Sequence, residues 1–378
     1  MKITRTVKLK LKCSPTELLP TIKLYTESFN KVCSVGWEDQ DFNGVSLHHK
    51  TYKHIREYLP SQLAVTSRMK ATEALKSIKK KKKTSCPQSK LSSIRYDARS
   101  YNAMLDKGAV SLLTVSGRKV FKTSVPECFI KYLSWRRTTA DLFLKNNKLF
   151  LHIVFEKDIA DPVLTGETVG IDRGINKIAV TSANKFYSGK SSKRIISGYR
   201  KLRDKLQSKG TPSAKRHLKR LSQKENSYRA DVNHCVSKSI VAETNPGAVL
   251  VLEDLKSIRQ NCRFRKKQRA QVHNWSYFQL QQFLTYKATE KGIAVEYVDS
   301  RYTSQKCSVC GYTSRSNRAS QANFKCKKCG LTLNADLNAS RNIRQNYLTA
   351  TCGTDRAAVN QPIVASDDTQ ILRGLSGA

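Results

Sequence analysis

The chain has 378 residues, more than one ordinary hydrophobic core holds, so its length predicts two or three domains. It carries 69 Lys and Arg against 29 Asp and Glu, a formal net charge of +40 with a pI near 10.0. A charge of that size opposes a compact state unless a polyanion neutralises it, so nucleic acid is the expected partner. A ribosomal-type protein or a merely solubilising surface would share this charge, but neither explains the ordered metal site described below.

The cysteines and the apolar segments argue against a secreted or membrane-spanning protein. Four of the eleven cysteines form a metal-type cluster, and the other seven show no disulfide framework spacing, as in a reducing cytosol. Residues 1–11 lack the apolar run of a signal peptide, and no stretch approaches the roughly 20 apolar residues of a membrane span. We therefore expect a cytoplasmic protein with no membrane partner. The seven scattered cysteines are Cys13, Cys33, Cys86, Cys128, Cys235, Cys262 and Cys352.

The first ninety residues predict one strand followed by helices. Apolar and basic residues alternate over 3–11, which is a strand pattern. A capping box with proline at the first helical position occupies 14–17 and predicts a helix start. Apolar residues at helical spacing over 18–32 give that helix one buried face, and the helical pattern continues to about Ser77. The lysine run at 79–83 is either a solvated linker or a phosphate contact.

Residues 91–158 predict a β-rich segment. The opening strand is expected to join this sheet across the helical insertion. A boundary follows near 161–166, where proline and glycine interrupt the pattern. Short apolar runs with turn residues between them predict strands at 109–115, 142–144 and 148–155.

The second half shows the succession of a ribonuclease H topology, beginning with a hairpin. A strongly basic helical stretch follows, with 13 Lys and Arg over 193–229 and only two acids. The final stretch, 351–378, is expected to be poorly ordered. The predicted elements are strands at 168–172, 177–181, 248–252 and 293–298, a helix near 275–291, and a last helix from about Ala335.

Two cysteine pairs have the spacing of a zinc ribbon. Each pair is a Cys-X-X-Cys followed by glycine, and fifteen residues separate the pairs. All four ligands would come from the protein, so the zinc would be structural and could not activate water. The predicted zinc ligands are Cys307, Cys310, Cys326 and Cys329.

Three acidic residues stand at the ends of predicted elements. Asp172 follows a buried strand and lies between two glycines that allow close backbone approach. Glu253 directly follows the apolar strand 248–252, at the carboxyl end where open α/β sheets bind ligands. Asp336 lies in the first turn of the last helix, behind Asn334 as the expected N-cap. Taken singly, each acid is equally well explained as a turn or helix-dipole residue.

Taken together, the three acids predict a metal site. They follow the order of strand 1, strand 4 and last helix of the ribonuclease-H-like pattern, and carboxylates suit Mg²⁺ or Mn²⁺ rather than zinc. Two such ions roughly 3.5–4 Å apart would activate water and stabilise a leaving 3′ oxygen. Seven positions separate Cys329 from Asp336, so the ribbon is expected to help position this acid.

At these motifs the chain resembles the TnpB (OrfB) family of insertion-sequence proteins, relatives of the compact type V CRISPR effectors. The matching segments are similar to the family's three RuvC motifs and zinc ribbon. The match is specific over 168–345, and before that it rests on layout. The segments are Gly170–Ala179, Leu252–Leu255, the two cysteine pairs, and Ala335–Ile343.

The resemblance implies an α/β nuclease domain of RNase H (RuvC-like) fold with an inserted zinc ribbon, plus an N-terminal β-barrel-like wedge domain with a helical insertion. The implied division is a split wedge at 1–12 and 91–164, a helical recognition lobe at 13–90, a nuclease domain at 165–302 and 333–350, the ribbon at 303–332, and a disordered tail at 351–378.

The resemblance also implies an RNA-guided DNA endonuclease. A guide RNA would pair with the target strand, and double-stranded DNA would be cut next to a short adjacent motif. Asp172, Glu253 and Asp336 carry over as ligands of catalytic Mg²⁺, expected as two ions, with Mn²⁺ as an alternative. Arg318, between the cysteine pairs, matches an arginine that faces the scissile phosphate. A monomer on its guide RNA is the favoured assembly.

Three other interpretations stay open. A compact type V CRISPR effector would use the same chemistry with a guide from a CRISPR array. A guided DNA-binding repressor would silence without cutting, although the complete set of acids argues against it. A transposase could join DNA ends through the same fold. The origin of co-purifying RNA would identify a CRISPR effector, cleavage activity would exclude the repressor, and a strand-transfer assay without RNA would decide on the transposase.

Overall fold

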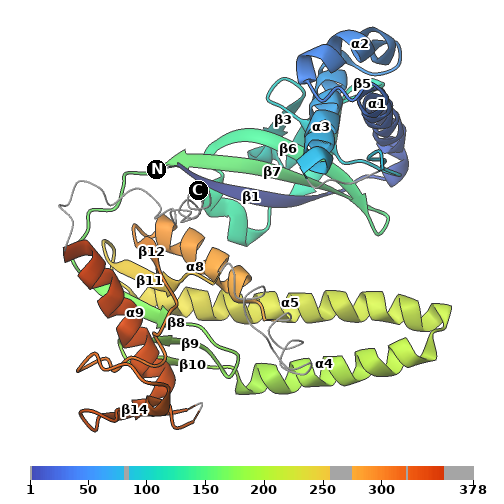
Figure 1. Ribbon diagram of the computed structural model, residues 1–378. Helices are drawn as coiled ribbons and strands as arrows, with labels where there is room; N and C mark the ends of the chain where they lie inside the picture. The colour runs from blue at the N-terminus through green and yellow to red at the C-terminus, as the bar shows by residue number, and fades with distance from the viewer. Residues whose placement is uncertain (1, 81–84, 256–274, 321, 353–378) are drawn as a thin grey trace, which may run out of the picture. The chain divides into compact units, whose positions relative to one another are not determined.

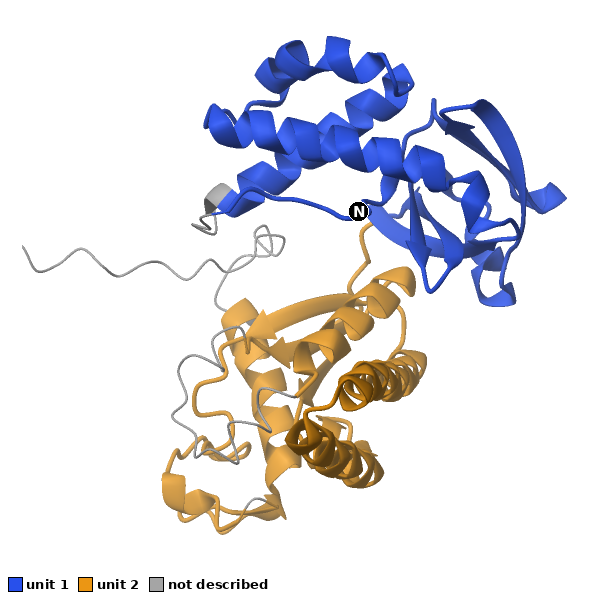
Figure 2. Cartoon of the chain, turned by 90° about the vertical axis from the view of Figure 1, so that its right-hand side faces the viewer, with its two compact units in different colours: residues 1–160 blue, residues 161–378 orange. Residues whose placement is uncertain are grey.

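The computed structural model describes residues 2–80, 85–255, 275–320 and 322–352, without the side chains of residues 79, 80 and 352. The chain forms two compact units, residues 1–160 and 161–378 (Figure 2). The lysine run at 79–83 is only partly described, and the predicted disordered tail lies outside the described residues from 353 onward. None of the described helices is both long and apolar enough to cross a membrane.

Seven antiparallel strands form the sheet of the N-terminal unit (Figure 1). Their order is β2-β6-β7-β1-β5-β4-β3. The strands are β1 Lys2–Leu11, β2 Ile94–Tyr96, β3 Tyr101–Met104, β4 Ala109–Thr114, β5 Gly117–Ser124, β6 Arg136–Lys145 and β7 Lys148–Asp158.

Strand β1 lies between β7 and β5, which confirms that the opening strand joins the sheet across the helical insertion. Its apolar residues Val7, Leu9 and Leu11 point into the core, while the basic residues between them face outward. Strands β6 and β7 are joined by Asn146 and Asn147, both at positive φ, as a tight two-residue hairpin requires.

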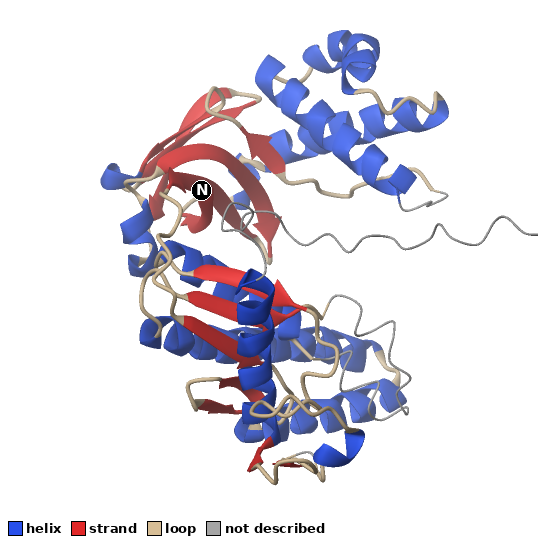
Figure 3. Ribbon diagram, turned by 60° about the vertical axis from the view of Figure 1, so that its left-hand side comes forward, coloured by secondary structure: helices blue, strands red, loops and turns tan. Residues whose placement is uncertain are grey.

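The sheet is strongly curved, as Figure 3 shows. Side chains link strands that are far apart in the strand order: the Tyr101 hydroxyl donates to the Thr138 carbonyl at 3.3 Å, and the Arg137 guanidinium donates to the Ala103 carbonyl. These bonds join β3 to β6 and hold the curvature in place.

Three helices, α1 Leu19–Glu38, α2 Gly44–Arg56 and α3 Ser61–Lys80, form the insertion between β1 and β2. The capping box exists, because the Ser14 backbone N–H donates to Glu17 Oε1 at 2.9 Å. It opens the 3₁₀ turn Pro15–Glu17 instead of the α-helix itself. Pro20 has no N–H to donate, so regular helix begins only at Leu19. Helices and sheet share one hydrophobic core.

A five-stranded mixed sheet, in the order β10-β9-β8-β11-β12, is the centre of the C-terminal unit. β8 pairs antiparallel with β9, as the predicted hairpin requires, and parallel with β11, which pairs parallel with β12. The strands are β8 Thr168–Asp172, β9 Lys177–Thr181, β10 Phe186–Ser188, β11 Val249–Glu253 and β12 Ala294–Val298.

Helices cover both faces of this sheet. Helices α5 Pro212–Glu243 and α8 Tyr277–Glu290 pack on one face against a cluster that includes Ile171 and Leu252. Helix α9 Ala335–Cys352 packs on the other face, where Ile343 meets Val249 and Val251. Helix α4 Lys190–Lys209 pairs with α5 as an antiparallel hairpin that extends beyond the sheet (Figure 1).

The cysteine segment is inserted between β12 and α9. It contains the short helix η4 Arg315–Asn317 and an antiparallel hairpin of β13 Asn323–Lys325 and β14 Thr332–Asn334. Gly311 and Gly330, which follow the two cysteine pairs, adopt positive φ values of 72° and 75°. β14 continues directly into α9, because Asn334 is followed at once by Ala335.

Candidate active site

The three acids predicted from the sequence come together on the α9 face of the sheet. Asp172 ends β8 and Glu253 ends β11, and these strands are parallel neighbours with Ile171 opposite Leu252. Because side chains alternate along a strand, Ile171 and Leu252 face α5 and α8, so both acids face α9. Asp336 lies in the first turn of that helix.

Gly170 allows α9 to lie close to the sheet. A Cβ at this position would lie 2.1 Å from the Ser340 carbonyl oxygen and 2.6 Å from the Arg344 nitrogen, both backbone atoms of α9. No side chain larger than hydrogen fits there, so the glycine before Asp172 sets the distance between strand and helix. The close approach expected from the sequence is therefore present, and it brings Asp336 to the strand ends.

The N-terminus of α9 is capped as predicted. Asn334 Oδ1 accepts the backbone N–H groups of Asp336 at 3.1 Å and of Leu337 at 3.3 Å. The cap satisfies two otherwise orphaned donors of the first turn. It also fixes the backbone of Asp336 at the point where the helix meets the sheet.

Burial and the neighbouring acids raise the pKa of Asp172. Burial, followed by the charges of Glu253 and Asp336, raises the pKa of Asp172 to about 8. The Arg318 charge and the backbone N–H of Arg173 act in the opposite direction. Burial also raises the pKa of Glu253, which is only 8% exposed. Carboxylates in this state gain stability from a bound cation, which removes their repulsion.

Two cations flank Asp336. Arg318 Nη2 lies 3.6 Å from Asp336 Oδ1, and Lys177 Nζ lies 3.7 Å from Asp336 Oδ2. The first contact places the predicted Arg318 beside the acids. Lys177, at the start of β9, was not foreseen, because nothing in a single lysine of a basic chain distinguishes it.

The loop that carries Arg318 is held by its neighbour Asn317, which is fully buried. The Asn317 amide donates to the carbonyls of Gln305 at 3.0 Å and Tyr312 at 3.1 Å, and its Oδ1 accepts the Lys327 backbone N–H at 2.9 Å. This side chain therefore joins the two cysteine turns, and the next residue projects toward Asp336.

Two buried side chains that sequence reasoning missed hold Glu253 in place. The Thr303 hydroxyl donates to Glu253 Oε1 at 2.5 Å. Arg173, only 4% exposed, donates through Nη2 to the Glu253 carbonyl at 2.5 Å and through Nη1 to Gln281 Oε1 at 3.0 Å. Arg173 directly follows Asp172 in the sequence, and this position could have marked it as a residue of the site. Nothing in the sequence marks Thr303, because its contact with Glu253 depends on how the loop before the ribbon folds.

One side of α9 anchors the loop that leads into the ribbon. The Asn342 amide donates to the carbonyls of Thr303 at 2.8 Å and Lys306 at 2.6 Å. Asn338 donates to the same Lys306 carbonyl at 2.8 Å and accepts the Ser308 backbone N–H at 3.0 Å. The helix that carries Asp336 thus also fixes the threonine that orients Glu253.

The four predicted cysteines form a compact cluster. Their sulfur atoms all lie within 4.8 Å of one another, with Cys307–Cys329 at 3.7 Å and Cys310–Cys326 at 3.6 Å. A tetrahedral zinc with Zn–S bonds of about 2.3 Å would place its sulfurs roughly 3.8 Å apart, so the cluster fits zinc. The backbone N–H of Cys329 also lowers the pKa of Cys326 to about 6, which favours the thiolate.

The acids are less tightly gathered than the cysteines. Within the part of the chain that the structure describes, only the cysteines have three or more ligand atoms that close together. Two of the acids have close partners of their own, Thr303 for Glu253 and two cations for Asp336. Carboxylate oxygens are the ligands that hard divalent cations prefer, so the donor set of the three acids fits Mg²⁺ or Mn²⁺.

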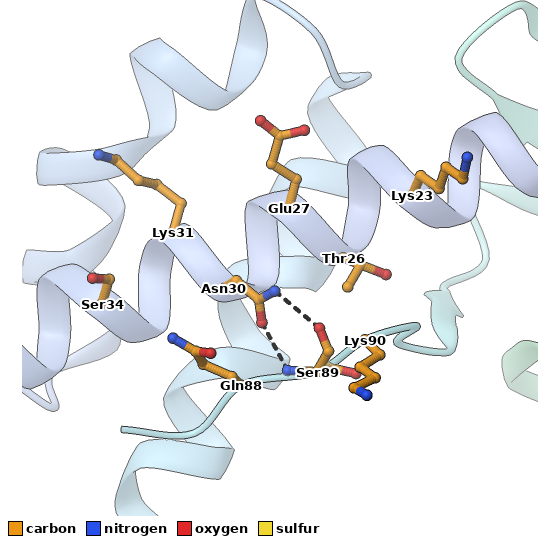
Figure 4. Close-up of a pocket in the computed structure, with 9 residues that line it drawn as sticks. All are labelled: Lys23, Thr26, Glu27, Asn30, Lys31, Ser34, Gln88, Ser89 and Lys90. Carbon is orange, nitrogen blue, oxygen red and sulfur yellow. Dashed lines mark hydrogen bonds between the residues drawn. The ribbon is translucent and has the colours of Figure 1, made fainter. Parts of the chain in front are cut away.

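A hollow of about 500 Å³ lies on α1 in the N-terminal unit. Figure 4 shows Lys23 and Lys31 on α1 and Lys90 on the facing segment. The Asn30 amide donates to the Ser89 carbonyl and accepts the Ser89 backbone N–H, both at 2.9 Å, and so holds that segment against the helix. The hollow is a basic surface patch with no buried acid-base group.

Two family models match the chain. One, described as a probable transposase (OrfB_IS605), covers residues 152–257, and the other, a Cas12f1-like TNB domain, covers residues 277–343. The first includes Asp172 and Glu253, and the second includes the cysteine cluster and Asp336.

Curated proteins and solved structures are similar as well. Cas12f1, a CRISPR-associated endodeoxyribonuclease of Sulfoacidibacillus thermotolerans, is 43% identical over 129 residues, 33% of this chain and 29% of the relative. InsQ of Escherichia coli K12, a putative RNA-guided DNA endonuclease, is 30% identical over 216 residues, 52% of this chain and 53% of the relative. The chain thus spans about a third to a half of the length of these relatives.

A Cas12f1 chain in a cryo-EM complex with sgRNA and target DNA has a TM-score of 0.59, covering 86% of this chain and 81% of that chain at 18% identity. That likeness concerns the fold, which is that of the compact RuvC-containing effectors. Together the comparisons confirm the resemblance to the TnpB family that the motifs predicted.

Proposed function

We propose that this chain, a relative of the TnpB and Cas12f proteins, is an RNA-guided DNA endonuclease of the TnpB type. It cuts double-stranded DNA next to a short adjacent motif by metal-dependent phosphodiester hydrolysis. The observation that carries the proposal is the convergence of Asp172, Glu253 and Asp336, from three distant segments, at one end of the sheet.

In this proposal each residue near the acids has a role. Asp172, Glu253 and Asp336 hold catalytic Mg²⁺ or Mn²⁺, which when bound as a pair activates water and stabilises the leaving 3′ oxygen. Arg318 and Lys177 neutralise Asp336 in the absence of metal and are near enough to contact the scissile phosphate afterwards.

The remaining surface would hold nucleic acid. The α4–α5 hairpin carries all 13 cations between residues 193 and 229, and the hollow on α1 adds three lysines. Phosphate contacts of this kind bind guide RNA and target DNA without reading bases. We assign the N-terminal unit to the wedge and recognition lobe and the C-terminal unit to the nuclease and ribbon, with a monomer on its guide RNA.

A compact type V CRISPR effector is the second candidate. The 43% identity to a Cas12f1 protein over the shared segment favours it. Both candidates use the same site, so they differ only in the origin of the guide. Sequencing RNA that co-purifies with the protein would separate a transposon end from a CRISPR array.

Guided cleavage of a plasmid tests the proposal. The protein, its co-purified RNA and Mg²⁺ should cut a plasmid that carries the matching target and should leave one without it intact. Asp172→Ala should abolish cutting while RNA binding persists. Asp204→Ala, which removes an exposed aspartate of α4, is the matched control and should cut normally.

Three outcomes would contradict the proposal. Full cutting by Asp172→Ala would contradict the assignment of the three acids as ligands of the catalytic metal. Target binding by the wild type without cutting would indicate a guided repressor. Strand transfer in the absence of RNA would indicate a transposase.

A further inference from the structure

A cavity of about 240 Å³ lies at the Asp172 end of β8, on the face of the sheet opposite to α9, between the β8–β9 turn, α4, α5 and the start of α8. We call it the base slot. Its volume is more than ten times the roughly 10–15 Å³ that one water molecule needs, so the cavity has room for one flat ring system. Its apolar and aromatic lining includes Ile175, Ile178, Ile196, Tyr228 and Trp275.

The base slot has a basic rim and a rigid floor. Lys193 and Arg200 are exposed at its edge. Arg203 and Arg229 both pair with Glu225, which is 5% exposed; Arg229 Nη2 lies 2.7 Å from Glu225 Oε1. Four cations against one acid leave the lining with a net charge of +3. An apolar interior under a cationic rim matches a nucleotide, whose base is flat and whose phosphate is anionic.

The base slot is linked to the acids through short connections. Gly174 and Ile175 line it and follow Asp172 by two and three residues. Tyr277, which also lines it, accepts a hydrogen bond from Arg173 Nη1 at 3.4 Å, and Arg173 Nη2 bonds the Glu253 carbonyl. The slot and the acids therefore lie at the same end of the sheet.

We propose that the base slot holds one unpaired nucleobase of the DNA strand that enters the active site. Stacking on Tyr228 and Trp275 holds the base, and Lys193 and Arg200 contact its phosphates. A strand held there runs past the end of β8 toward Asp172. The inference rests on the proposed function, because DNA is the strand that the acids act on. Base–aromatic stacking in such sites changes affinity by roughly 5- to 140-fold.

The proposal can be tested with two tryptophan variants of α4, one that fills the slot and one at the adjacent position that does not. Ile196→Trp places an indole in the slot, whereas Ile195→Trp places the same group on the exposed face of α4, where Ile195 is 38% exposed. The probe is a fluorescent oligodeoxythymidylate without guide RNA or Mg²⁺. Ile196→Trp should weaken binding at least 5-fold, and Ile195→Trp should stay within 2-fold of wild type.

An abasic probe isolates the base from the phosphates. Wild type should bind it at least 5-fold more weakly than the thymidylate, and Ile196→Trp should bind both probes alike. Equal binding of both probes by the wild type would overturn the slot. Photocrosslinking of a 5-iododeoxyuridine target in the guided complex should label the Tyr228 or Trp275 peptide. Labelling from an iodouridine guide RNA instead would overturn the assignment to DNA.

The two proposals fail separately. Base-dependent oligonucleotide binding without guided cleavage would retain the slot and reject the nuclease. Guided cleavage by the wild type with no difference between the thymidylate and abasic probes would retain the nuclease and reject the slot.

Discussion

Replacing Gly170 by alanine tests whether α9 must touch the sheet for the acids to meet. The new Cβ would lie 2.1 Å from the Ser340 carbonyl oxygen, whereas ordinary contact begins at 3.4 Å. The obstructing atom is backbone and cannot rotate away. Helix α9 would therefore retreat by about 1.3 Å, the difference between these distances, and would carry Asp336 with it.

A displacement of about 1 Å at reacting groups costs roughly 100-fold in rate. We therefore expect Gly170→Ala to lower the single-turnover rate of guided cleavage roughly 100-fold. Overpacking of this kind also costs about 1–3 kcal/mol of folding free energy, which thermal unfolding would detect. Guide RNA binding and zinc content should persist, since the change lies between strand and helix.

Gly198→Ala is the matched control. It makes the same chemical change in α4, where a Cβ would meet nothing within 4 Å, and alanine is the better helix former by about 1 kcal/mol. This variant should cleave like the wild type. If Gly170→Ala matched it in both cleavage rate and melting temperature, the argument that the glycine sets the position of Asp336 would be wrong.

Three further predictions concern the same site. Thr303→Val removes the hydrogen bond to Glu253 and should lower the single-turnover rate about 10- to 100-fold, with Thr303→Ser near wild type. Cys326→Ser should reduce zinc content and also cleavage of already bound DNA by misplacing Asp336; a normal rate on bound DNA would refute that coupling. Without metal, the raised pKa of Asp172 means that folding favours its protonated form, so stability should fall as pH rises from about 4 to about 8. Asp172→Asn should flatten that fall in thermal unfolding, and an unchanged pH dependence would contradict it.

Elements whose signal is local were predictable from the sequence. A pattern of only a few neighbouring residues predicts each of three elements: the hairpin of β8 and β9, the apolar strand before Glu253, and the cysteine turns. The ribonuclease-H-like order of the predicted strands and helices also indicated that β8 and β11 are adjacent in the sheet. The predicted helix start at Ser14 was displaced to Leu19, because Pro20 interrupts the helical hydrogen bonds.

Contacts made only by tertiary folding were not predictable. Thr303 meets Glu253 because Asn342 holds the loop between them, and neither residue has a distinguishing sequence context. Lys177 meets Asp336 because Gly170 lets α9 approach the sheet. The base slot likewise depends on how three helices and a turn pack together, and the hydrophobic pattern of any one of these elements does not predict that packing.

The direct junction of β14 and α9 has a consequence for length variation in this part of the chain. A helix advances about 100° per residue, so one residue inserted at this junction would turn β14 and the second cysteine turn about the axis of α9, while Asp336 would keep its register with the sheet through Ser340. Within the loop between the cysteine pairs, 311–325, Asn317 ties the two cysteine turns together, so added residues there would also displace Arg318. The length of the chain is therefore restricted on both sides of the second cysteine pair.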